Sequence, residues 1–259
     1  MKHRCPALAP AWTKVLRLGP WLRGEKDKRL YWQMFSSRGY ISGLRKQAIL
    51  LTSKYVPEKT ASAAFGPRAS NCVVEFRGME HQFTPFASEG MFIRDRLKRL
   101  ARPWVLEAVQ AEWPAERRFI AVHIRRGDFQ PWDPLKAAGS VLQMQLPVEW
   151  YAAAIRRAKD AVGDDVQTLV FTDGSELGLE AILAQKKTFL ATDAPALCHM
   201  LALANAVAIV GSASTFSMWG AFLSTAPAIW FPGVSPPPRF AGAVNIQDAF
   251  GLDAGFPAK

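Results

Sequence analysis

A buried run of residues followed by two arginines is the part of this chain best suited to chemistry. It is the segment FIAVHIRRGDF, residues 119–129, in which Arg125 and Arg126 come directly after the run. A short apolar run bounded by charge predicts a buried parallel strand, so the arginines fall at its carboxyl end, where open α/β sheets bind ligands. Each guanidinium offers a planar fork of donors that suits phosphate, and Gly127 lets the backbone turn close to a ligand. The segment predicts a clamp for phosphate or pyrophosphate.

Plainer interpretations of the same segment remain open. Paired arginines on a loop are often only solvated charge, and His123, which alternates with Val122 and Ile124, has the position of an ordinary core histidine. The Arg-Gly-Asp tripeptide at residues 126–128 is also found in cell-adhesion ligands. Such a ligand needs an exposed, flexible tip, and a tripeptide that abuts a buried strand disfavours that function.

A second candidate anion site lies in the segment VGSASTFSMWG, residues 210–220, which passes from a predicted strand into a predicted helix. Hydroxyls at Ser214 and Thr215, beside Phe216, meet the free N–H groups and positive dipole end of that helix, which suits phosphate. For any one serine, an ordinary N-cap is the stronger interpretation. Asp173 and Asp193 each follow a predicted strand and are placed to accept hydrogen bonds from a ribose or base. Two anion-binding elements at one sheet edge favour a nucleotide-diphosphate ligand.

The elements that must position these residues alternate between strand and helix from Phe119 onward. A repeating βα pattern predicts a parallel, doubly wound sheet with right-handed crossovers, and hence an α/β domain over residues 118–259. The tail after Pro232 is expected to be irregular because it is rich in Pro and Gly. The predicted strands are 119–124, 168–173, 188–191, 207–212 and 228–231, and the predicted helices are 148–162, 175–185, 194–206 and 214–224.

Residues 1–117 show no full alternating set of strands and are expected to form a reduced, mainly helical N-terminal half. Residues 71–78 predict one strand, and residues 29–55 predict helix. Residues 89–113 predict one or two helices broken at Pro103.

Composition indicates a protein with a sizeable core and no membrane span. Apolar residues make up 49% of the 259, and no apolar run is long enough to cross a bilayer. Three widely spaced cysteines give neither a disulfide framework nor zinc-ligand spacing, which favours a reducing cytoplasm. Charges and prolines interrupt every apolar run near the start, so we expect no signal peptide.

The net charge of +10 belongs to the N-terminal segment. Residues 1–60 hold thirteen Lys and Arg against three acidic residues, whereas the rest of the chain holds nineteen of each sign. Such a segment attracts nucleic acid or anionic lipid. Its aromatic residues favour a membrane interface, so we expect peripheral contact of residues 1–60 with an anionic membrane, at its cytoplasmic face, and no nucleic-acid partner.

Two absent motifs narrow the enzyme class. The chain has no GxxxxGKS phosphate loop, which argues against ATP or GTP hydrolysis. No DxD pair follows a predicted strand, which argues against a metal-dependent sugar transferase.

Four segments resemble, in this order, the fucosyltransferases that share an HxRRxD motif, above all the α-1,2-fucosyltransferases of glycosyltransferase family 11. The segments are VHIRRGDF, LPVEWYAAAI, LVFTDG and SASTFSMWGAFL, the last with Met218 where the family usually has Trp. EFRGMEHQFTPFASEGMFIRDRL, residues 75–97, resembles the family's middle region more weakly. The resemblance covers roughly residues 70–231.

The resemblance implies a GT-B architecture and GDP-β-L-fucose as the donor. It also implies inversion at the anomeric carbon, no required metal or other cofactor, and a glycan hydroxyl as acceptor, in surface polysaccharide or lipopolysaccharide synthesis of a bacterium. Arg125 and Arg126 would then act together, one of them neutralising the departing diphosphate and the other structuring the loop, with Asp128 orienting the arginines. Glu149 and Asp133 would be the candidates for the base that deprotonates the acceptor. The residues that bind the donor would also include His123, Asp173, Asp193, Ser214, Thr215 and Phe216.

The family also has a Gly-rich segment of the type GGLGNQ, and this chain contains none. We therefore expect either a reduced N-terminal domain, a start upstream of Met1, or lost catalysis. The main alternative function is an inactive nucleotide-sugar or glycan-binding protein. A basic membrane- or nucleic-acid-binding protein, with the α/β half as scaffold, is a further alternative.

Overall fold

The computed structural model describes residues 34–36, 41, 43–57, 72–75, 83–137, 140–174, 177–238 and 244–246. The chain divides into two compact units, Met1–His81 and Gln82–Lys259. The second unit contains the predicted helices of residues 89–113 together with the sheet, and our domain boundary between residues 117 and 118 stays a prediction.

The first unit contains one described helix and a pair of strands. Helix α3 covers Gly43–Thr52, and β1, Lys54–Pro57, pairs in parallel with β2, Cys72–Glu75. The strand predicted within residues 71–78 is therefore present, but the helix predicted over 29–55 ends at Thr52. β-Prone Tyr55 and Val56 continue as strand, and the Tyr55 hydroxyl donates to the Leu50 carbonyl at 2.8 Å. Of the same predicted helix, residues 29–33, 37–40 and 42 lie outside the described residues, Met34 is helical, and Phe35, Ser36 and Ile41 are not.

The second unit is built on a parallel sheet of six strands in the order β5-β4-β3-β6-β7-β8. All five predicted strands are present, and the α/β, doubly wound fold class is confirmed. The arrangement of two facing domains that GT-B implies stays a prediction. The strands are β3 Phe119–Ile124, β4 Gln167–Thr172, β5 Thr188–Leu190, β6 Ala208–Gly211, β7 Ala228–Trp230 and β8 Asn245–Ile246.

Strand β3 lies at the centre because every one of its residues can be buried. All six are buried, His123 among them, and the strand pairs on one side with β4 and on the other with β6. A continuous apolar run is the pattern expected of a parallel strand that is covered on both faces.

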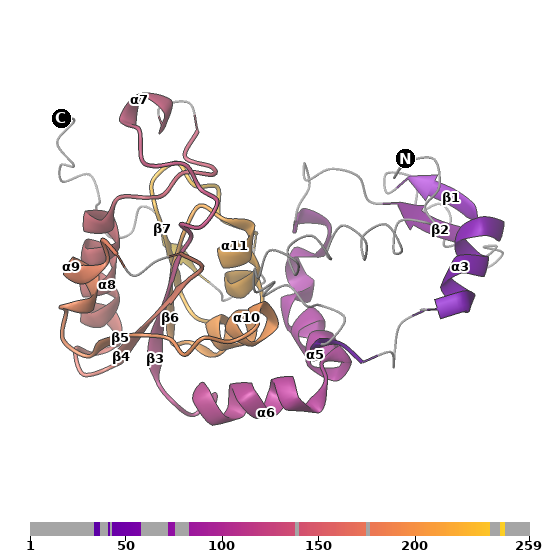
Figure 1. The fold of residues 1–259 in the computed structure, drawn as a ribbon, viewed down its shortest axis with the longest axis horizontal. Helices are drawn as coiled ribbons and strands as arrows, with labels where there is room; N and C mark the ends of the chain where they lie inside the picture. Colours follow the sequence, from indigo (N-terminus) through magenta and orange to yellow (C-terminus); the bar gives the residue numbers. More distant parts are fainter. Residues whose placement is uncertain are drawn as a thin grey trace, which may run out of the picture. The chain divides into compact units, whose positions relative to one another are not determined.

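Helices cover both faces of this sheet (Figure 1). Helices α8, Val148–Val162, and α9, Glu180–Leu183, lie on one side, and α10, Ala196–Asn205, and α11, Thr215–Phe222, lie on the other. The boundaries of α8 match the prediction because Pro147 precedes it and Gly163, at a φ of 113°, ends it.

Helices before β3 attach to the α10–α11 side. The 3₁₀ helix η3, Thr84–Glu89, leads into α5, Gly90–Leu100, and α6, Pro103–Glu112, so the predicted break at Pro103 is present. The Phe83 ring packs against the Trp219 and Phe222 rings of α11, with centroids 4.8 and 5.0 Å away. Arg94 of α5 donates to the Asn205 side chain at 2.6 Å.

Two predictions for the second unit were wrong. The helix predicted over 175–185 is a single turn among the described residues, Glu180–Leu183, and Gly178 before it has a φ of 80° that interrupts a helix. The tail after Pro232 also adds a strand, because β8 pairs with β7 and the Trp230 indole donates to Asn245 Oδ1 at 3.0 Å. A strand of two residues is too short for periodicity to reveal.

The strand order reverses between β3 and β6. From β3 the chain proceeds outward through β4 to β5, and from β6 it proceeds the other way through β7 to β8. A crevice outside the carboxyl ends of the strands forms at such a switch point and is where doubly wound sheets bind ligands. Within the described residues, no helix combines the length and apolar character that a bilayer crossing requires.

Candidate functional site

The residues that follow β3 form a loop, residues 125–129, that we call the arginine loop. Asp173, which follows the neighbouring strand β4, binds it at two backbone positions. Its Oδ1 accepts from the N–H of Arg126 at 2.8 Å and from that of Gly127 at 3.1 Å. A Cβ on Gly127 would lie 2.9 Å from Asp173 Oδ2, so only glycine fits here without displacing the carboxylate. Asp173 therefore fixes the shape of the arginine loop.

Arg125 is held by two carboxylates. Its Nη1 lies 2.8 Å from Asp173 Oδ2, while Nε and Nη2 each lie 2.8 Å from Asp128 Oδ1. The guanidinium also sits 5.7 Å from the centroid of the Phe129 ring, within the range of a cation–π contact. Asp128 is 67% exposed, so this side of the ion pair is open to solvent.

Arg126 is bound by neutral groups. Its Nη1 donates to the Leu177 carbonyl at 2.7 Å. Gly174 and Gly178 leave room for it, since a Cβ at either would approach the Arg126 side chain to 2.8 and 3.4 Å. Within the described residues no carboxylate forms an ion pair with Arg126.

Gln145 connects the far end of the following loop to the arginine loop. Its Nε2 donates to the carbonyls of Arg126 at 3.0 Å and Phe129 at 2.9 Å. The Gln145 N–H also donates to the Gln130 carbonyl at 2.8 Å. No sequence signal indicated Gln145, because a lone glutamine in a long loop has no diagnostic spacing.

Three buried serines lie across the switch point from the arginine loop. We call Ser212, Ser214 and Ser217 the serine cluster. Ser214 caps α11, its Oγ accepting the Ser217 N–H at 3.2 Å, and Ser217 Oγ accepts the Ser212 N–H at 3.0 Å. The hydroxyls of Ser212 and Ser217 are 2.9 Å apart. The N-cap interpretation of Ser214 is thus correct, while its predicted contact with phosphate stays a prediction.

His123 is buried against this cluster. Its Nδ1 lies 2.7 Å from Ser217 Oγ and 3.1 Å from Ser212 Oγ, and its ring packs on Phe216 with centroids 4.8 Å apart. Burial lowers the pKa of His123 to about 3, so the ring is neutral near pH 7. It therefore supplies a fixed hydrogen-bonding surface beneath α11, and its predicted role as a nucleoside ligand stays a prediction.

The other predicted site residues are spread along the same edge of the sheet. Thr215 is exposed at the start of α11, and Glu149 is exposed in the first turn of α8. Asp193 lies in the loop after β5, the outermost strand on that side. The Asp133 carboxylate accepts the N–H groups of Leu135 and Lys136 at 3.0 and 3.4 Å, so it caps the short helix α7, Pro134–Ala137.

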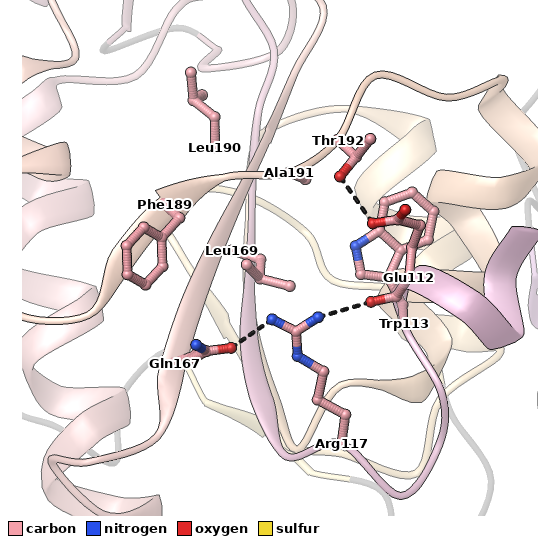
Figure 2. Close-up of a pocket in the computed structure, with 9 residues that line it drawn as sticks. All are labelled: Glu112, Trp113, Arg117, Gln167, Leu169, Phe189, Leu190, Ala191 and Thr192. Carbon is pink, nitrogen blue, oxygen red and sulfur yellow. Dashed lines mark hydrogen bonds between the residues drawn. The ribbon is translucent and has the colours of Figure 1, made fainter.

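A hollow of about 270 Å³ lies against β4 and β5 (Figure 2). Its polar groups are already bonded to one another: Thr192 Oγ1 donates to Glu112 Oε2 at 3.0 Å, and Arg117 donates to the Glu112 carbonyl and to Gln167. None of the predicted site residues lines it. Its lining consists of Glu112, Trp113, Arg117, Gln167, Leu169, Phe189, Leu190, Ala191 and Thr192.

Metal ligands do not gather anywhere in the described segments: no group of three or more His, Cys, Asp or Glu side chains could hold an ion. The chemistry available at the switch point is that of two guanidiniums and a helix N-terminus, both of which bind anions. An α/β protein with these two elements at the carboxyl ends of its strands is suited to a phosphorylated ligand.

A comparison with protein-family models identifies the family of this chain. The model of glycosyl transferase family 11 matches residues 73–234, and the chain belongs to this family. The match includes the arginine loop, the serine cluster and α8. No curated protein sequence matches the chain.

The solved structures that the chain is similar to include fucosyltransferase NodZ from Bradyrhizobium, at 18% identity and a TM-score of 0.36 over 51% of this chain and 47% of that one. NodZ α-1,6-fucosyltransferase co-crystallized with GDP gives 18% identity and a TM-score of 0.43, over 64% of this chain and 57% of that one. The same enzyme soaked with GDP-fucose gives 19% identity and a TM-score of 0.36, over 50% of this chain and 45% of that one. The chain thus spans about half the length of these proteins.

Proposed function

We propose that this chain transfers L-fucose from GDP-fucose to a hydroxyl of a glycan acceptor. The observation that carries the proposal is the placement of the arginine loop and the α11 N-terminus on either side of the β3–β6 switch point. Both lie inside the segment matched by the family, and both are suited to the diphosphate of a nucleotide-sugar. Binding of GDP and GDP-fucose by NodZ structures agrees with this donor.

The reaction would be a single inverting displacement. The acceptor oxygen attacks the anomeric carbon of fucose, the bond from that carbon to the diphosphate oxygen breaks, and GDP leaves with the bonding electrons. Negative charge grows on the diphosphate as this bond breaks, and fixed donors at that position lower the barrier. Arg126, with which no carboxylate of the described residues forms an ion pair, would meet this charge with its guanidinium. Arg125 would do so by exchanging Asp128 for phosphate. No metal is required in this scheme.

The acceptor hydroxyl must also lose a proton. Glu149 is our candidate for the base because its carboxylate is exposed at the start of α8. Asp133 is less suitable because its carboxylate already caps α7. Asp128 would act on the arginines rather than on the acceptor, because Arg125 binds it through two nitrogens.

The acceptor class and the cellular site are further parts of the proposal. We propose an α-1,2 linkage to a surface polysaccharide or lipopolysaccharide oligosaccharide, as the family resemblance implies. Peripheral contact of residues 1–60 with an anionic membrane is supported by α3. That helix exposes Leu44 and Leu51 at 88% and 74%, beside the basic residues Arg45 and Lys46.

A second candidate function is binding of the nucleotide-sugar without catalysis. The absence of a GGLGNQ-like segment from this sequence favours it. Both functions require the donor site, and only the first releases GDP from GDP-fucose in the presence of an acceptor glycan.

Calorimetric titration of GDP and GDP-fucose into the chain, with EDTA present, tests the donor site. We expect saturable binding that weakens by at least about 100-fold in the Arg125→Ala/Arg126→Ala variant, because charge-assisted hydrogen bonds to phosphate are lost. The matched control is Arg117→Ala/Arg118→Ala, which removes two adjacent arginines before the same strand and should bind normally. Equal weakening by both variants would contradict the assignment.

A further inference from the structure

Tyr151 carries a buried hydroxyl that no function has yet been given. The side chain is fully buried in α8, and its Oη has no hydrogen-bond partner in the described part of the chain. A buried polar group without a partner costs free energy, so such groups are uncommon in folded proteins and call for an explanation. Other buried atoms here also lack partners, among them Thr168 Oγ1 at the start of β4. Trp150 Nε1, on the same helix, is another, and Tyr151 differs from these atoms in having the Ser212 side chain beside its hydroxyl.

The Tyr151 hydroxyl lies beside the donor site. Helix α8 packs against β3 and β6, the two strands of the switch point. The hydroxyl is next to the Ser212 side chain, without forming a proper hydrogen bond, and within electrostatic reach of Arg126. His123 contacts the same Ser212 from the side covered by α11. Ser212 thus stands between a tyrosine from one face of the sheet and a histidine from the other.

The serine cluster has fewer protons than contacts. Five side-chain contacts of 2.7 to 3.2 Å join the His123 Nδ1 and the three serine oxygens. Three hydroxyl protons, with at most one more on the ring nitrogen, serve these five contacts. If one serine turns its proton toward a ligand, the cluster loses a donor that it cannot replace from within.

Tyr151 is the donor that could replace it. Burial raises the pKa of Tyr151 above its usual value, so the phenol keeps its proton throughout the neutral range. Ser212 Oγ is the acceptor beside it, and a hydroxyl can accept more than one hydrogen bond. A small approach of α8 to the end of β6 would complete this bond, as often happens when a ligand tightens a site.

We propose that Tyr151 is a positioning residue of the donor site: it donates to Ser212 when a nucleoside diphosphate binds, and thereby frees a serine proton for a phosphate oxygen. The serine that donates is Ser214, the cap of α11 and the most exposed of the three at 6%. This inference rests on the proposed function, because it assigns Tyr151 a part in the same site.

The test is Tyr151→Phe, measured by thermal unfolding without ligand and by GDP titration. We expect an unchanged or higher Tm for the free variant, because the hydroxyl that is removed has no partner. We expect a GDP Kd about 5- to 10-fold higher than that of the wild type, the value of one lost hydrogen bond. The matched control is Tyr55→Phe, whose hydroxyl does have a partner, and which should leave the Kd unchanged.

A double-mutant cycle with Ser212→Ala separates positioning from packing. In the Ser212→Ala background, Tyr151→Phe should cost no further GDP affinity, because the acceptor of its proton is absent. Additive losses, a lowered Tm of Tyr151→Phe, or wild-type affinity of that variant would each overturn the inference alone. Failure of the wild-type chain to bind GDP would overturn the proposed function, and this inference with it.

Discussion

Asp173 and Arg125 follow neighbouring strands and form an ion pair of 2.8 Å at the carboxyl edge of the sheet. The same carboxylate accepts the two N–H groups that shape the arginine loop. Arg125 therefore has one partner that is part of the scaffold, Asp173, and one that is open to solvent, Asp128. The two carboxylates should respond differently to substitution.

Asp173→Ala should lower the free energy of unfolding by about 1–3 kcal/mol, because two backbone donors and a guanidinium lose their acceptor. It should also weaken GDP binding, since the arginine loop loses its shape. Asp128→Ala should change stability by no more than about 1 kcal/mol, as is usual for an exposed pair. Its affinity for GDP should be unchanged or higher. Urea unfolding measures the stability of the two variants, and GDP titration measures their affinity. Equal destabilisation by the two substitutions would contradict the different roles of the two carboxylates.

His123 predicts a loss of stability at acidic pH. Its pKa is about 3 in the folded chain and near 6.5 when unfolded. Between these values the unfolded state binds a proton that the folded state does not. Stability is therefore complete above about pH 6.5 and falls as the pH drops toward 3, by at most about 1.4 kcal/mol per pH unit.

His123→Gln should flatten this part of the pH profile, because the titrating group is gone. Urea unfolding at several values between pH 4 and pH 7 compares the two chains. If the variant keeps the wild-type slope, the proton uptake belongs to other groups.

Gln145→Ala should release the long loop that follows the arginine loop, because two carbonyls lose their donor. We expect a GDP Kd about 3- to 10-fold higher, in line with one or two hydrogen bonds, and faster proteolytic cleavage within residues 130–145. Gln110→Ala, at an exposed glutamine of α6, is the control and should change neither. Unchanged cleavage in Gln145→Ala would show that the loop is held by other contacts.

Helix α3 predicts where membrane contact would begin. Leu44 and Leu51 are seven residues apart and share a helix face. Leu44→Ser/Leu51→Ser should reduce sedimentation with vesicles that contain phosphatidylglycerol, while Leu135→Ser, at a similarly exposed leucine of α7, should not. Binding of the wild type should fall with added salt, because basic side chains contribute. Equal sedimentation of both variants would contradict the role of α3.

The sequence was most informative where a pattern was long or sharply bounded. The apolar run of β3 and the Pro147–Gly163 limits of α8 predicted both elements correctly, since burial and backbone conformation are local properties. The two residues of β8 and the single turn of α9 offered no period to detect.

Within the candidate site, residue types were easier to predict than partners. The paired arginines and the hydroxyls of residues 212–217 were evident from the sequence. The contacts of Asp173 and Gln145 with the arginine loop could not be predicted, because they depend on the order of the strands and on the path of the loop. Tyr151 lies within the predicted helix 148–162, and only the position of its hydroxyl in the structure distinguishes it.

The sheet ends on both sides in short described strands. β5 has three residues and β8 has two, whereas β3 and β4 have six each. An outer strand offers unpaired backbone groups to any molecule that can add a strand of its own, and short edges offer few of them. The described edges of this sheet therefore expose few backbone groups through which two copies could pair edge to edge and aggregate, even when the protein is concentrated.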